Sequence, residues 1–106
     1  MSERIETLKR ALEKDPNNPL GLYGLALELF KEKRYDEAIL YLHKYIDIHE
    51  DEGAAYRLLA QSYLNIGDVE KAIEYYQKGI EQAKKFNHQS MVEEFSQEIE
   101  NLKGML

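Results

Sequence analysis

The sequence feature that most constrains the fold is an internal repeat of 34 residues. Residues 53–86 align with residues 19–52 without a gap, and most of the shared residues are small or apolar. Two unrelated amphipathic segments rarely keep both their small and their large apolar positions aligned, so we interpret the match as a true repeat. The matched pairs are Leu25 and Leu59, Ala26 and Ala60, Ala38 and Ala72, Ile39 and Ile73, Tyr41 and Tyr75, Lys44 and Lys78, and Ile46 and Ile80.

Each copy has the pattern of a helical hairpin. In the second copy, large residues recur at helical spacing on both sides of the stretch Asn65-Ile66-Gly67-Asp68. Gly67 suits the left-handed residue that follows a helix end, and the carboxylate of Asp68 can cap the next helix. In the first copy Lys33 takes the place of Gly67, so that hairpin must turn without glycine. The pattern predicts four helices, over residues 20–33, 36–49, 54–66 and 69–85.

A further helix is predicted before the first repeat. Residues 2–14 place four apolar residues on one face, namely Ile5, Leu8, Ala11 and Leu12. The turn residues of 15–19, with two prolines, separate this helix from the repeat. Because no earlier helix forms a hairpin with it, we expect it to cover the first repeat as an N-terminal lid.

A last helix is predicted over residues 88–104, where the repeat pattern fails. Its apolar stripe suits a terminal cap, because a solenoid otherwise leaves the surface of its last repeat bare. A capping box at Ser90-Met91-Val92-Glu93 is expected near its start. The alternating steps of three and four along the stripe leave a short coiled-coil or dimer seam as the alternative. The stripe consists of Met91, Val92, Phe95, Ile99, Leu102 and Leu106.

The two hairpins resemble the tetratricopeptide repeat. The family pattern falls on Leu22, Leu25, Ala26, Leu29, Ala38 and Leu42 in the first copy, and on Tyr56, Leu59, Ala60, Tyr63, Gly67, Ala72 and Tyr76 in the second. Residues 11–18 are similar to the end of a preceding repeat. The departures are Lys33 for glycine, Tyr45 and Gly79 at a position that is usually alanine, and Glu50 and Lys84 at the proline position. The resemblance implies an all-α, right-handed solenoid that forms a single domain over residues 1–106.

The resemblance also implies where a partner binds. In this family the first helix of each hairpin lines a concave groove that commonly holds a peptide. The Lys, Asn and Arg clamp with which some members hold a C-terminal carboxylate is absent, so apolar anchors should dominate and salt should affect the affinity little. Four apolar residues of the first repeat look surplus to the packing of the hairpin. The expected partner-binding residues are Leu20, Tyr23, Leu27 and Phe30, together with Arg57, Gln61, Leu64 and Asn65.

Composition excludes several classes of function. The chain has no cysteine, which excludes disulfides and thiolate metal sites. Its net charge of −6, with 32% charged residues, argues against nucleic acid and anionic membranes as partners. No apolar run approaches the ~20 residues that span a bilayer, and the start of the chain has no signal-peptide core, so a cytoplasmic location is expected. His43 and His49 are six residues apart and point to different helix faces, so no metal site is expected, and no catalytic or cofactor site is found.

The sequence therefore predicts a non-catalytic protein–protein interaction module that receives an apolar peptide or helix in its groove. A self-assembling unit, joined to another copy through the groove or through the C-terminal helix, is the alternative.

Overall fold

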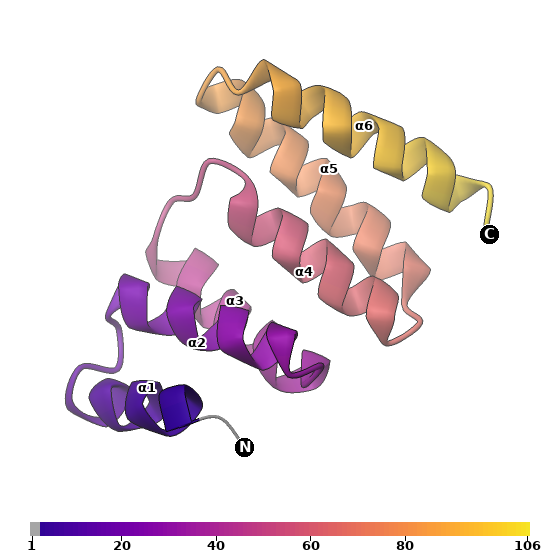
Figure 1. The fold of residues 1–106 in the computed structure, drawn as a ribbon. Coiled ribbons are helices and arrows are strands. Elements are labelled where there is room, and N and C mark those ends of the chain that lie inside the picture. The colour runs from indigo at the N-terminus through magenta and orange to yellow at the C-terminus, as the bar shows by residue number, and fades with distance from the viewer. Residues whose placement is uncertain (1–2) are drawn as a thin grey trace. The chain divides into compact units, whose positions relative to one another are not determined.

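The described chain folds into helices joined by short turns. The computed structural model describes residues 3–106, so Ser2, the first residue of the predicted N-terminal helix, lies outside it. The helices of these residues are α1 (Glu3–Lys14), α2 (Pro19–Lys31), α3 (Tyr35–Ile48), α4 (Ala54–Asn65), α5 (Val69–Lys85) and α6 (Gln89–Lys103) (Figure 1). Within the described residues there is no strand, and every predicted helix is present. The all-α prediction is confirmed.

The chain divides into two compact units. Unit 1 comprises residues 1–50 and unit 2 comprises residues 51–106. This division falls two residues before the boundary that the internal repeat predicts between residues 52 and 53. That residues 1–106 act as one domain remains a prediction.

In unit 1, α2 packs against both α1 and α3. Leu22, Leu25 and Leu29 of α2 are buried, as are Ala38 and Leu42 of α3. The N-terminal helix contributes to this core as the predicted lid, since its Ile5 and Leu12 are buried. Leu8 is half-buried and lies beside Gly24 of α2, whereas Ala11 is exposed, so the predicted face packs except at Ala11.

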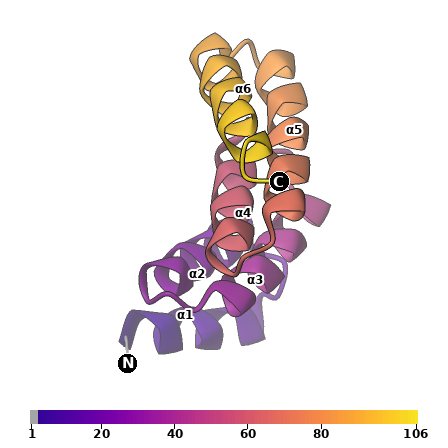
Figure 2. The ribbon, with the colours of Figure 1, turned by 90° about the vertical axis from the view of Figure 1, so that its right-hand side faces the viewer.

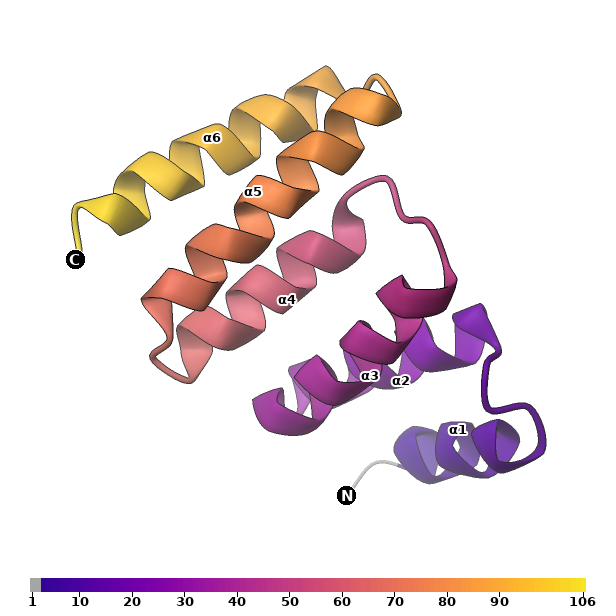
Figure 3. The same cartoon turned by 180° about the vertical axis from the view of Figure 1, so that it is seen from behind.

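In unit 2, α5 packs against both α4 and α6 (Figures 2 and 3). The ring of Phe95 lies so close to α5 that a Cβ atom on Gly79 would come within 2.6 Å of it. Its centroid is 5.2 Å from that of Tyr76. The apolar stripe of α6 is buried except for Leu106, which is 70% exposed. These residues pack as predicted for a terminal cap, which leaves few of them for a dimer seam.

Three helix ends share one backbone geometry. Lys33, Gly67 and Asn87 have positive φ angles of 61°, 87° and 58°. After each of them the next amide donates a hydrogen bond to the carbonyl five residues earlier: Arg34 N to Leu29 O at 2.9 Å, Asp68 N to Tyr63 O at 2.9 Å, and His88 N to Ala83 O at 2.7 Å. The glycine prediction at position 67 is confirmed. Lys33 adopts the same conformation at a cost of about 1 kcal/mol.

The caps of the following helices match the predictions in part. Asp68 Oδ1 accepts a hydrogen bond of 3.0 Å from Lys71 N, as predicted. The capping box at Ser90 is wrong, because His88 is the N-cap of α6 and Ser90 lies inside the helix. Asn87 has a positive φ angle that ends the preceding helix, so α6 begins at Gln89, before Ser90. Asp51 is a buried cap that the sequence interpretation missed: its Oδ2 accepts from Gly53 N at 2.9 Å and from Ala55 N at 2.8 Å.

Candidate partner-binding surfaces

The predicted anchors of the first repeat form an apolar stripe on α2. We name Leu20, Tyr23, Leu27 and Phe30 the α2 face. Leu20 is 86% exposed, and the other three are half-buried. Only Glu28 and Lys31 carry charge in this helix, whereas a helix with one solvent-facing side normally carries a polar stripe there. The α2 face therefore leaves apolar surface in contact with water.

Two members of the α2 face also support the hairpin. The ring of Tyr23 lies 5.3 Å from that of Tyr45, and the ring of Phe30 lies edge-on to Tyr35 at 5.4 Å. Such aromatic pairs stabilise packing beyond their buried area. The interpretation of all four residues as surplus is thus wrong for Tyr23 and Phe30. Leu20 is the most exposed of the four residues, so its side chain contributes least to the packing of unit 1.

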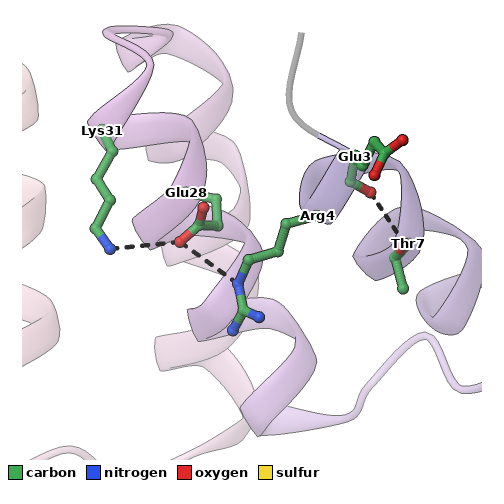
Figure 4. A network of polar contacts seen from close by, with 5 residues as sticks. All are labelled: Glu3, Arg4, Thr7, Glu28 and Lys31. Carbon is green, nitrogen blue, oxygen red and sulfur yellow. Dashed lines mark hydrogen bonds and ion pairs between the residues drawn. The ribbon is translucent and has the colours of Figure 1, made fainter.

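A polar contact joins α1 to α2 (Figure 4). One carboxylate oxygen of Glu28 lies 3.5 Å from Arg4 Nε of α1 and 3.5 Å from Lys31 Nζ of α2. The Glu28 side chain is only 18% exposed, while both cations are largely exposed. In the same view, Thr7 Oγ1 donates a hydrogen bond of 2.9 Å to the carbonyl of Glu3. Because Glu28 follows Leu27 and Lys31 follows Phe30 along α2, these charged groups border the apolar stripe.

The predicted residues of the second repeat lie on α4 in a polar setting. Arg57 makes two hydrogen bonds of 2.7 Å to the carboxylate of Glu94 in α6, and its guanidinium lies 5.4 Å from the ring centroid of Phe95. Asn65 Nδ2 donates a 2.8 Å hydrogen bond to the backbone carbonyl of Gln61. Leu64 is half-buried. We name Arg57, Gln61, Leu64 and Asn65 the α4 face.

The Tyr76 hydroxyl lies among the charges near this face. Burial, followed by the negative charges of Glu98 and Glu94, raises the pKa of Tyr76 to about 12. The positive charge of Arg57 and a hydrogen bond with Gln61 act in the opposite direction. The phenol is thus neutral at physiological pH and serves as a hydrogen-bonding group. Glu94 and Glu98 are the residues near this face that the sequence interpretation missed, because α6 does not follow the repeat.

The structure adds no sign of a metal centre. Across residues 3–106, no three side chains of His, Cys, Asp or Glu come together in a way that would hold a metal ion. The ring of His49 lies 5.0 Å from that of Tyr45. Among the acidic residues of 50–52, Asp51 directs its carboxylate at backbone amides. None of the helices in residues 3–106 has the length and apolar character needed to cross a membrane.

Comparison with known proteins agrees with the observed hairpins. Two family models, both described as tetratricopeptide repeat, match residues 29–93 and residues 7–40. Anaphase-promoting complex subunit 3 from Dictyostelium discoideum is 31% identical over 74 residues, which are 70% of this chain and 8% of that protein. The chain thus matches less than a tenth of that relative's length.

A solved structure has the same fold. The solution structure of protein BPP2914 from Bordetella parapertussis matches with a TM-score of 0.83 at 21% identity, covering 99% of this chain and 91% of that one. Taken with the family models, one of which spans more than half of the sequence, these findings identify the chain as a member of the tetratricopeptide repeat family.

Proposed function

We propose that this protein is a non-catalytic module that binds an apolar peptide or helix of a partner protein on its α2 face. Tetratricopeptide repeats indicate a protein–protein interaction module. The relative from Dictyostelium discoideum is named as a subunit of a complex, which is consistent with a partner-binding role. The observation that carries the proposal is the 86% exposure of Leu20 on a helix with little polar surface.

The spacing of the α2 face suits an apolar partner. Its residues follow one another at steps of three, four and three, so they lie along one side of α2. Leu20 and Leu27 supply aliphatic surface, and the rings of Tyr23 and Phe30 are held in place by Tyr45 and Tyr35. An apolar patch bordered by charged groups is typical of a protein-binding site. Rings that are already fixed lose little side-chain entropy when a partner binds.

The α4 face is proposed as a separate, polar surface. Gln61 and Asn65 offer amide groups, and Leu64 offers a half-buried apolar contact. Arg57 is bound to Glu94, so a partner that uses this arginine must compete with that carboxylate. We expect this face to orient a partner by hydrogen bonds.

Self-association through the α2 face is the second candidate. The C-terminal stripe supports it less, because Val92, Phe95, Ile99 and Leu102 are buried. Light scattering across a hundredfold range of concentration distinguishes the two candidates. A constant monomer mass favours a different protein as the partner, and a stable dimer that Leu20→Glu dissociates favours a second copy.

A matched pair of substitutions tests the main proposal. Leu20→Glu places a charge in the α2 face, whereas Leu40→Glu makes the same change at a 51% exposed leucine of α3. Peptides selected from a random library on the wild-type protein provide the probes. We expect Leu20→Glu to weaken their binding at least about tenfold and Leu40→Glu to change it less than about twofold.

Three results would count against the proposal. One is equal loss of binding in the two variants, and another is a selected peptide set without apolar side chains. A third is strong weakening of binding by salt, because contacts of apolar groups are insensitive to screening. Circular dichroism spectra of both variants establish that the fold is retained.

A further inference from the structure

We propose that a pocket between α1, the turn that follows it and α3 binds an acidic segment of a partner protein through one large apolar side chain. The buried side chains of Leu12 and Leu22, together with Pro16 and Tyr41, line the pocket, whose volume is about 220 Å³. Sites for small molecules enclose about 300–1,000 Å³. The pocket of this protein is smaller than such sites, and its volume suits a single anchoring side chain of a peptide.

Lysines at the rim give the pocket its charge. Lys44 Nζ lies 5.2 Å from the ring centroid of Tyr41, an arrangement in which the ammonium is attracted to the aromatic face. Lys9 also lines the pocket, and its side chain is one-third exposed. Both ammonium groups therefore lie beside an apolar lining, where a carboxylate next to an anchoring side chain would reach them.

Lys9 retains capacity for a second carboxylate. Its Nζ lies 3.8 Å from Glu37 Oε1, while Arg34 Nη2 donates a 3.0 Å hydrogen bond to the same oxygen. The hydrogen bonding of Arg34 is the main reason that the pKa of Glu37 lies below its ordinary value, and the charge of Lys9 is a smaller one. An ammonium group has three donors, and the long contact to Glu37 leaves donors of Lys9 for another acceptor.

The surroundings of the pocket are also basic. The adjoining surface of α1 carries Arg10 and Lys14, and Glu13 is the single acidic residue that lines the two surfaces. Four cations and one carboxylate line these surfaces, and Glu37 is a second carboxylate beside Lys9, so the region is basic in a chain whose net charge is −6. This local reversal of charge favours an acidic partner segment. Besides α1, the turn and α3, the site uses Leu22 of α2, but it includes no residue of the α2 face.

Fluorescence polarisation with designed peptides tests the inference. The probe is an eight-residue labelled peptide in which Asp and Glu flank a central Leu-Phe pair. One comparison peptide has Lys in the flanks, and another has Ala-Ala in the centre. At about 50 mM salt we expect the probe to bind at least about tenfold more tightly than either comparison peptide.

Three variants locate the binding. Lys44→Glu should weaken binding of the probe about tenfold, and Glu13→Gln should strengthen it about twofold, because each changes the charge at the rim. Lys84→Glu on α5 is the matched control, since it makes the same charge change at another exposed lysine. We expect it to alter binding less than twofold.

Other outcomes would overturn the inference. Equal weakening by Lys84→Glu and Lys44→Glu would mean that only net charge matters. Equal binding of the Ala-Ala peptide would exclude the pocket as the anchor site. Displacement of the probe by a thymidine oligonucleotide at the same concentration as by unlabelled peptide would point to a general anion surface. Circular dichroism of each variant checks that the helices remain.

Discussion

The two units share a repeat frame but fill one matched position in opposite ways. In unit 1 this position is Tyr45, whose ring packs on Tyr23 of the same hairpin. In unit 2 it is Gly79, which has no side chain, and the ring of Phe95 takes the space. At this matched position a side chain of the same hairpin fills the space in unit 1, whereas a side chain of the following helix fills it in unit 2.

The candidate faces differ in the same sense. Leu20 on α2 is in contact with water, whereas Arg57 on α4 is bonded to Glu94 of α6. In unit 2 the terminal helix thus supplies both the apolar and the charged groups that complete the surface of the last repeat. The comparison teaches that the helices added to a repeat decide which of its surfaces remain available.

Removal of the Phe95 ring is expected to have the largest effect on unit 2. Phe95→Ala leaves a cavity beside Gly79 and Tyr76 and should lower the free energy of unfolding by about 3–5 kcal/mol. Urea denaturation followed by circular dichroism measures the loss. A change below about 1 kcal/mol would mean that α6 is not packed through this ring.

A second substitution tests the glycine itself. Gly79→Ala should cost about 1–3 kcal/mol, because the new Cβ would lie 2.6 Å from Phe95 Cε2. In the Phe95→Ala background the cost should be smaller, with the 3.0 Å approach to Tyr56 Cβ remaining. If the two losses in free energy of unfolding were strictly additive, the prediction that the ring of Phe95 packs against Gly79 would be contradicted.

Alkaline pH should separate Tyr76 from other contributions to stability. Below pH 10 its phenol is neutral in both states. Between its ordinary pKa of 10.0 and its folded value of about 12, only the unfolded phenol loses its proton. The free energy of unfolding should therefore fall by about 1.4 kcal/mol per pH unit from this group alone. Denaturation at pH 9 and pH 11 should show a shallower fall in Tyr76→Phe, and equal falls would contradict the prediction.

The helix ends give the smallest expected effects. Lys33→Gly should stabilise the protein by about 0.5 kcal/mol, because the gain in the left-handed conformation exceeds the added entropy of the unfolded chain. Gly67→Ala should destabilise it by about 1 kcal/mol through conformation alone, since a Cβ there meets nothing within 4 Å. The melting temperature of each variant, compared with that of the wild-type protein, measures these changes in stability. A lower melting temperature for Lys33→Gly, or a higher one for Gly67→Ala, would contradict the shared left-handed geometry of the two turns.

The sequence predicted the fold well because the repeat carries local signals. Helix spacing, Gly67 and Asp68 act within one or two turns of the chain, so they can be recognised without the structure. The capping box at Ser90 was wrong because Asn87, an asparagine in a glycine role, ends α5 and lets α6 begin earlier. Asp51 was missed because the turn before α4 brings its carboxylate to amides two and four residues ahead.

The candidate surfaces were less predictable because they depend on contacts between distant residues. Arg57 and Glu94 are 37 residues apart, and α6 does not follow the repeat, so no spacing predicted their pairing. The half-burial of Tyr23 and Phe30 depends on which residues of α3 face them. The pocket beside Lys9 and Lys44 likewise requires α1 to lie next to the hairpin.

Because Arg57 is bonded to Glu94, a side chain of the protein itself competes with any partner for this arginine. Glu94 presents a carboxylate to the guanidinium in the bidentate geometry that an acidic side chain of a partner would use. Because this rival is tethered to the same fold, its effective concentration does not fall on dilution. A partner that engages Arg57 binds only the fraction of molecules in which the pair is open, and its apparent affinity is reduced by that fraction.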